Sequence, residues 1–219
     1  FMTTRHSLVG FSNKNTKLIF DPQLDLKQFI TIEFKIANDS YYSDLVLIVP
    51  NIYLKSLDNC YNRNSDLNKL EDRCFNAIKS EFLTQFTSPE ANSYWLSAQP
   101  ILDQSVLENQ NSVQWKFSAG IINPTDIKDI QTQSSPYLSH FFSLVNNTSN
   151  LSQPGVSGNL IRKINLEANS RQPSIGKFLG LIICKSKLSP THAGFTFALN
   201  IQSLFQDTAL EGYFTTVDQ

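Results

Sequence analysis

Alternation of apolar and polar residues is the clearest pattern along the chain. Three segments alternate with a period of two residues, namely 28–37, 112–118 and 195–202. Their apolar members are Ile30, Ile32, Phe34 and Ile36, then Val113, Trp115 and Phe117, and finally Phe195, Phe197, Leu199 and Ile201. This pattern is typical of antiparallel strands that have one face on the core and one in water. We therefore expect the apolar members to face the core and the intervening polar residues to face solvent.

Other segments read as strands of a different kind. Residues 45–49 and 178–183 are apolar at every position, which predicts central strands covered on both faces. Residues 17–20, 94–101 and 160–168 complete the set. The total of about eight strands is typical of a β-sandwich.

Two helical segments interrupt these strands. A long helix is predicted over 66–86, with Ser65 or Asp66 as its N-cap. Its apolar stripe at helical spacing consists of Leu67, Leu70, Cys74, Ile78, Phe82 and Phe86. A shorter helix is predicted near 136–145, because Pro136 suits a first helical turn and apolar residues follow it. A brief helical piece is also predicted at 125–130.

The predicted fold is a β-rich α+β domain. It is an antiparallel two-layer sandwich of about eight strands, with the long and the short helix inserted, and a jelly-roll-like order is compatible with that strand count. The segment 146–159 is rich in Asn, Ser and Gly, and we interpret it as a long surface loop. Alternating apolar and polar segments of the same kind occur before and after this loop, so residues 1–219 are predicted to form a single domain.

Composition narrows the class of protein. With 41% hydrophobic residues and 16 Phe in 219 residues, the chain can bury a core, which excludes global disorder. The net charge of −1 excludes a histone-like or polyacidic character. No run of about 18 consecutive apolar residues is present, so the sequence predicts no membrane-spanning helix.

Charge is distributed unevenly along the chain. Residues 162–187 carry six basic side chains and one acidic side chain, a net charge of +5, whereas residues 21–108 carry seven basic and thirteen acidic ones, a net charge of −6. The candidate polyanion-binding or nucleic-acid-binding residues are Arg162, Lys163, Arg171, Lys177, Lys185 and Lys187. Such a surface can neutralise phosphates or contact the acidic half of a neighbouring copy, and exposed strand edges carry similar charges without any ligand.

Catalytic chemistry finds little support in the sequence. We find no nucleophile elbow, no phosphate-binding loop and no calcium-loop pattern. Of the three histidines, His6 lies in a segment that we expect to be frayed, and His140 has Phe141 and Phe142 as neighbours. His192 stands in a turn, where a neutral imidazole can act as a general base, but the sequence indicates no partner for it.

The cysteines and histidines suggest no metal centre and no cofactor. The three cysteines, Cys60, Cys74 and Cys184, show no spacing typical of zinc ligands. A Cys60–Cys74 bridge would suit an oxidising compartment, but Cys74 falls on the apolar face of the predicted helix, which favours three free thiols.

Three functional hypotheses remain, in order of preference. The first is a non-catalytic structural, assembly or interaction subunit of a larger particle or complex, such as a coat-like or scaffold component, with a virion as one such particle. It would associate with itself or with other protein subunits. The second is a nucleic-acid-binding subunit of a nucleoprotein complex that uses residues 162–187. The third is an enzyme with a dispersed site near His192.

Overall fold

The structure is a computed structural model, and its described part comprises residues 1–9, 29–52, 67–100, 115–123, 137–145, 157–167, 172–185 and 196–216. Contacts divide the chain into two compact units. The first, here called the sheet unit, consists of residues 1–85 and 202–219, and the second, the barrel unit, consists of residues 86–201. Each unit is described by itself.

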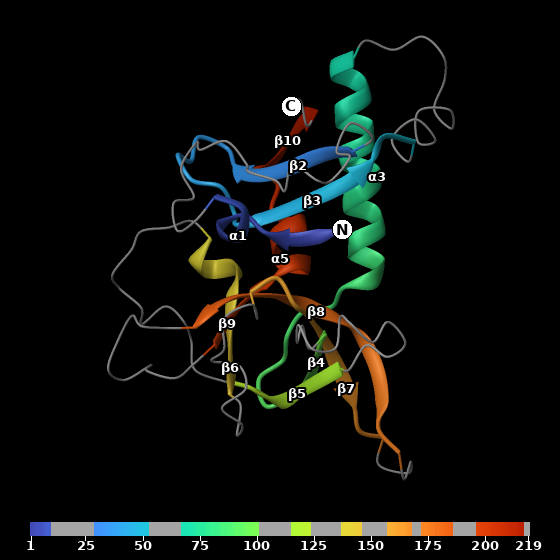
Figure 1. Cartoon of the computed structure of the whole chain (residues 1–219), viewed down its shortest axis with the longest axis vertical. Helices are drawn as coiled ribbons and strands as arrows, with labels where there is room; N and C mark the ends of the chain where they lie inside the picture. The colour runs from blue at the N-terminus through green and yellow to red at the C-terminus, as the bar shows by residue number, and fades with distance from the viewer. Residues whose placement is uncertain are drawn as a thin grey trace, which may run out of the picture. The chain divides into compact units, whose positions relative to one another are not determined.

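A four-stranded antiparallel sheet forms the sheet unit, in the order β1-β3-β2-β10 (Figure 1). Its strands are β1 (Met2–Thr4), β2 (Phe29–Ile36), β3 (Leu45–Pro50) and β10 (Leu210–Thr216). The central strands are the apolar and alternating segments found in the sequence. The first and last strands bring the two ends of the chain into one sheet, and neither was expected from its pattern.

One face of this sheet packs against two helices, α3 (Leu67–Gln85) and α5 (Ile201–Gln206). Phe34 of β2 is fully buried there, with its ring centroid 6.0 Å from that of Phe75 in α3 and 5.3 Å from that of Phe205 in α5. The rings of Phe82 and Phe205 stack at 5.1 Å. Helix α3 therefore has its predicted place, and Cys74 and Ile78 of its predicted apolar stripe are buried, whereas Phe75, which contacts Phe34, was not part of that stripe. Helix α5 was expected to be the end of a strand.

The opposite face of β2 is less exposed than alternation predicted. Thr31 and Glu33, which we expected in solvent, are 2% and 8% exposed. Glu33 is an ion-pair partner of Arg5, so the side chain that was expected to face solvent is instead a buried charge. A short helix, α1 (His6–Val9), follows directly after Arg5.

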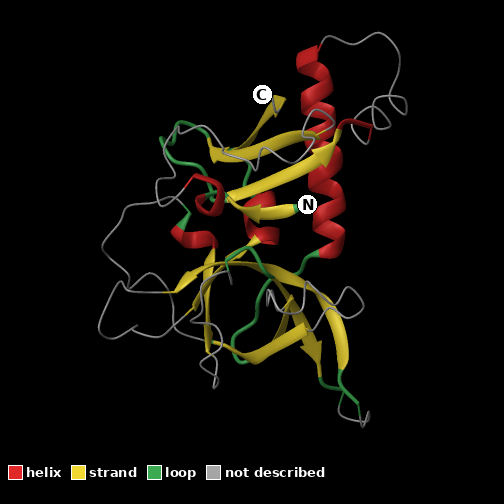
Figure 2. Cartoon of the chain, in the orientation of Figure 1, coloured by secondary structure: helices red, strands yellow, loops and turns green. Residues whose placement is uncertain are grey.

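The barrel unit is a closed antiparallel barrel of six strands in the order β4-β5-β6-β9-β8-β7 (Figure 2). The strands are β4 (Tyr94–Pro100), β5 (Trp115–Ile122), β6 (Phe141–Val145), β7 (Leu160–Asn165), β8 (Ser174–Lys185) and β9 (Thr196–Asn200). Strands β4 to β6 form one meander and β7 to β9 another. The pairs β4–β7 and β6–β9 join the two meanders and close the barrel.

The β-rich antiparallel character is thus confirmed, but the arrangement differs from the expected two-layer sandwich of about eight strands. Both architectures bury every second residue of each strand, so alternation does not separate them. The difference lies in pairing: residues 94–97 of β4 pair with residues 161–164 of β7, so the outer strands of the two meanders meet instead of ending as free edges.

Tight packing around Trp95 fixes the barrel interior. Trp95 is 0% exposed, and its indole N–H donates a hydrogen bond to the Ile121 carbonyl at 3.1 Å. Opposite it, a Cβ on Gly120 would lie 3.1 Å from the Trp95 ring and 2.0 Å from the Val145 carbonyl oxygen. The remaining core members are Ile122, Phe142, Leu144, Ile161, Leu179, Ile182 and Ala198.

The predicted short helix near 136–145 is wrong. Only Leu138–His140 forms a single 3₁₀ turn, and Phe141–Val145 is strand β6. Aromatic and β-branched residues favour strands, and here Phe142 and Leu144 face the core while β5 and β9 pair on either side.

Some expectations fall on residues outside the described part, namely the strand at 17–20, the helical piece at 125–130 and the N-cap of α3. The same holds for most of the predicted loop, of which only residues 157–159 are described. The single domain stays a prediction. Among the described residues, no helix is long and apolar enough to cross a membrane.

Candidate interaction face of the barrel

Strand β5 carries its aromatic residues outward, contrary to expectation. Trp115 and Phe117 were predicted to face the core, yet they are 54% and 62% exposed. The reason lies in the neighbouring strand, because Trp95 fills the interior and its register partner on β5 is Gly120. Ser118 likewise opposes the buried Ser97. Ser118 and Gly120 therefore point inward on β5. Because side chains alternate between the two sides of a strand, Trp115 and Phe117 then point outward.

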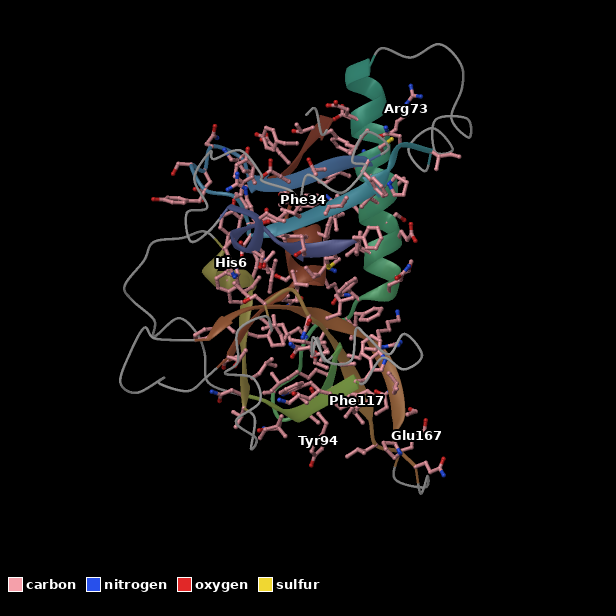
Figure 3. All side chains as sticks on the ribbon, viewed as in Figure 1. His6, Phe34, Arg73, Tyr94, Phe117 and Glu167 are labelled. Atoms are coloured by element: carbon pink, nitrogen blue, oxygen red, sulfur yellow. The ribbon has the colours of Figure 1, made fainter. Side chains whose placement is uncertain are left out.

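Strand β4 adds to the same outer face. Residues that oppose each other in an antiparallel pair project to the same side, and Ala98 opposes Phe117 while Tyr94 opposes Ile121. Tyr94 is 47% exposed. Figure 3 shows Tyr94 and Phe117 on the barrel strands. Aromatic rings thus occur at two separate places along the outside of β4 and β5.

A cation projects to the same outer side of the barrel. Arg162 of β7 opposes Leu96 of β4, and so projects outward as well. Its guanidinium lies 4.6 Å from the ring centroid of Phe178, and its Nε donates to the Gly176 carbonyl at 3.2 Å. These two contacts orient an exposed, planar cation along an apolar surface.

Strand β8 extends the surface further. Ile164 opposes Tyr94 on one side and Ile175 on the other, so all three share the outer side, and Ile175 is 58% exposed. We call the set Tyr94, Trp115, Phe117, Arg162 and Ile175 the aromatic face. It was missed from the sequence, because Ser118, Ala119 and Gly120 are small residues on both sides of β5 and do not indicate which side points inward.

The six predicted basic residues do not form one described cluster. Arg162 and Lys163 are successive residues of β7 and project to opposite sides, and the Lys163 ammonium is 2.8 Å from the Glu90 carboxylate. Lys177 is exposed next to the register shift between β7 and β8. Arg171 and Lys187 lie outside the described residues, and so does the side chain of Lys185. Polyanion binding through this set stays a prediction.

The sheet unit contains a polar cluster around Arg5 and His6. Both carboxylate oxygens of Asp44 contact His6: Oδ1 accepts from the His6 backbone N–H at 2.7 Å and Oδ2 lies 2.6 Å from Nδ1. The buried Arg5 forms an ion pair with Glu33 and lies 4.2 Å from the centroid of the Tyr42 ring. The expectation of a frayed segment around His6 is therefore wrong (Figure 3).

These contacts change two proton equilibria. The hydrogen bond to Asp44 raises the pKa of His6 above its usual 6.5, although burial acts in the opposite direction. A hydrogen bond from the Tyr213 hydroxyl to Glu211, at 2.6 Å, raises the pKa of Tyr213 to about 12. A histidine held by a buried carboxylate resembles half of a catalytic triad in geometry, but no described group completes it.

The remaining candidate groups give no chemistry within the described residues. No three His, Cys, Asp or Glu side chains there lie close enough together to hold a metal ion. Cys74 is buried in α3, and the expectation of three free thiols stays a prediction. Cys60 and His192 lie outside the described part, as does the side chain of Cys184.

Comparison with known proteins gives no match to a family model, to a curated protein or to a solved structure.

Proposed function

We propose that this protein is a non-catalytic assembly subunit, and that the aromatic face of its barrel binds a neighbouring copy of the chain. The observation that carries the proposal is the exposure of Trp115 and Phe117, at 54% and 62%, on the outer side of the barrel to which Arg162 also projects. Tryptophan, tyrosine and arginine are the residues in which binding energy concentrates at protein interfaces.

The energetic argument is one of burial. Covering a large apolar side chain contributes about 1.5 to 3 kcal/mol, and half of that gain is still unrealised in rings that are half exposed. Arg162 suits the same role because its guanidinium is weakly hydrated and already oriented by Phe178. Contact with a second protein surface would release this free energy.

Charge complementarity favours a second copy as the occupant. Residues 162–187 carry a net charge of +5 and residues 21–108 a net charge of −6. On helix α3, Glu71 and Asp72 are exposed acidic side chains. A contact between unlike surfaces of two copies is head-to-tail, and such contacts build rings or filaments.

The test is the dependence of mass on protein concentration, measured by light scattering. We expect the native chain to gain mass with concentration and the double variant Trp115→Ser, Phe117→Ser to need at least about tenfold more protein for the same gain. Ile52→Ser is the matched control, since Ile52 is 78% exposed but lies in the sheet unit. A native chain that stays monomeric, or a control that acts like the double variant, would contradict the proposal.

A second candidate is binding of single-stranded nucleic acid. It is favoured by the spacing of Trp115 and Phe117, two residues apart on one outer strand face, with Arg162 on the same outer side of the barrel. Successive bases stack on aromatic rings arranged in this way, while cations contact the backbone.

Fluorescence anisotropy of a labelled oligouridine distinguishes this candidate. If it holds, the logarithm of the affinity falls with the logarithm of salt concentration by about 0.7 per phosphate contact. Arg162→Ala should reduce this slope by about one contact, and Trp115→Ser should weaken binding without changing the slope. Affinity that is independent of salt would exclude it.

A further inference from the structure

Strand β10 ends the four-stranded sheet among the described strands, and it is long and regular for an edge. All seven of its residues pair with β2 without a register shift. The other edge, β1, has only three residues. A long flat edge is the usual template for pairing with another strand, whereas a short one is poorly suited to it.

The hydrogen bonds show which backbone groups face outward. The Ala37 N–H donates to the Ala209 carbonyl at 2.8 Å, and the Thr31 hydroxyl donates to the Thr215 carbonyl at 3.2 Å. Because the backbone groups of an antiparallel strand alternate between its two sides, odd-numbered residues of β10 face β2. The N–H and C=O groups of Gly212 and Phe214 therefore point to the outer edge, where the described residues offer them no hydrogen-bond partner.

Glu211 is the one charged residue that protects the edge of this strand. Its sequence, LEGYFTT, contains no lysine and no proline, and its pairing shows no bulge. Natural sheets use these features to block further strands. The barrel of the same chain avoids the problem by closing on itself.

We propose that β10 pairs with β10 of a second copy, antiparallel and centred on Tyr213, so that two sheets become continuous across a twofold axis. Gly212 of one copy then lies opposite Phe214 of the other, and the two residues exchange both backbone hydrogen bonds. The twofold axis repeats this pair, which satisfies all four outward groups of each strand's centre.

Side-chain complementarity selects this partner and this register. Glu211 lies opposite Thr215 of the second copy, so the one charged residue of the strand never meets its own equivalent. Gly212 has no side chain that could clash with Phe214 of the second copy, and the Phe75 ring of α3 lies 3.0 Å from where a Cβ on Gly212 would be. Tyr213, which is 41% exposed, meets its own copy on the other side of the sheet.

This interface goes beyond the proposed function because it uses a different surface and a different symmetry. A twofold contact joins two copies only, whereas the head-to-tail contact of the aromatic face can continue. Together they would give an assembly two independent interfaces, and an experiment can refute either interface without affecting the other.

Disulfide trapping of the full chain tests the register. The two Tyr213 residues would form a non-hydrogen-bonded pair with Cα atoms about 4.5 Å apart, which is within the range of a disulfide. We expect Tyr213→Cys to give a covalent dimer under mild oxidation, above the background of the native cysteines. Glu211→Cys alone and Thr215→Cys alone should not, but a mixture of these two variants should.

Charge variants at the exposed Thr215 supply a second measurement. Thr215→Glu places a carboxylate opposite Glu211 twice in the dimer and should weaken dimerisation about threefold to tenfold, whereas Thr215→Lys should strengthen it. Carrying out the trapping in the Trp115→Ser, Phe117→Ser background separates this interface from the aromatic face. Equal trapping of all three single cysteine variants, or no trapping of Tyr213→Cys, would overturn the proposal.

Discussion

Two neighbouring residues near the start of the chain, Arg5 and His6, are held by carboxylates that are distant in sequence, Glu33 in β2 and Asp44 just before β3. Arg5 is 1% exposed and pairs with Glu33, and His6 contacts Asp44, whose backbone has a φ of 67°. Breaking one partner of a buried ion pair typically costs about 3 to 5 kcal/mol, since the other charge stays buried. These contacts tie β1 and α1 to the rest of the sheet unit.

The pair of His6 and Asp44 gives stability a defined dependence on pH. The pKa of His6 is raised in the folded state above 6.5, so the stabilisation is fully present below pH 6.5 and is lost as the pH rises through the folded value. We expect His6→Ala to lower the free energy of unfolding by about 1.5 kcal/mol at the acidic end, and by less in alkaline solution.

Urea unfolding of the native chain and of His6→Ala, at pH values below 6.5 and above the raised pKa of His6, measures this difference in the free energy of unfolding. His140→Ala would be a poor control because His140 is buried elsewhere, so Ser7→Ala, next to His6 in α1, is preferable. A stability difference that grows as the pH rises would contradict the assignment.

Strand β5 shows how one glycine decides the direction of a whole element. Its alternating pattern identified a strand, but the inward side depends on the opposing Trp95 and on the missing side chain of Gly120. Polar Lys116 and Ser118 thereby share the inner side, and the aromatic residues Trp115 and Phe117 are left outside.

Unfolding measurements can check this orientation. Trp95→Ala should lower the free energy of unfolding by about 3 to 5 kcal/mol, because it empties a fully buried site. Trp115→Ala should change it by less than about 1 kcal/mol. Urea titrations followed by circular dichroism give both values, and the reverse ranking would mean that β5 presents its aromatic side to the interior.

The sequence predicted elements better than it predicted their pairing. Helix α3 and the strands β2, β5 and β9 were predicted from local periodicity, and β3 and β8 from uniformly apolar runs. Both signals depend only on neighbouring residues. Strand β6 was mistaken for a helix. Pro136 suits a first helical turn, and the few apolar residues that follow it fit helical spacing as well as the alternation of a strand. Closure of the barrel depends on contacts between β4 and β7, more than sixty residues apart, and no local pattern contains that information.

The candidate site shows the same limit. The basic residues were found by counting charges, yet Arg162 and Lys163 project to opposite sides of β7 once a strand is formed. The aromatic face could not be assigned because Trp115 and Phe117 are typical core residues by composition. Their exposure follows only from the filling of the barrel by Trp95.

At the level of the whole chain, two differently built units carry two candidate interfaces. The barrel unit closes through its strand pairs, and offers side chains on its outer surface. The sheet unit offers backbone groups along β10. An assembly subunit needs more than one contact to extend beyond a dimer, and the two surfaces are suited to different symmetries.

Tryptophan fluorescence tests the central claim, that the aromatic face is covered on self-association. The chain has two tryptophans, and quenching by acrylamide reports on Trp115 because Trp95 is 0% exposed. We predict that quenching in the native chain becomes weaker as protein concentration rises, over the same range in which the mass increases. Quenching that stays unchanged while the mass increases, or a mass that never increases, would contradict the account.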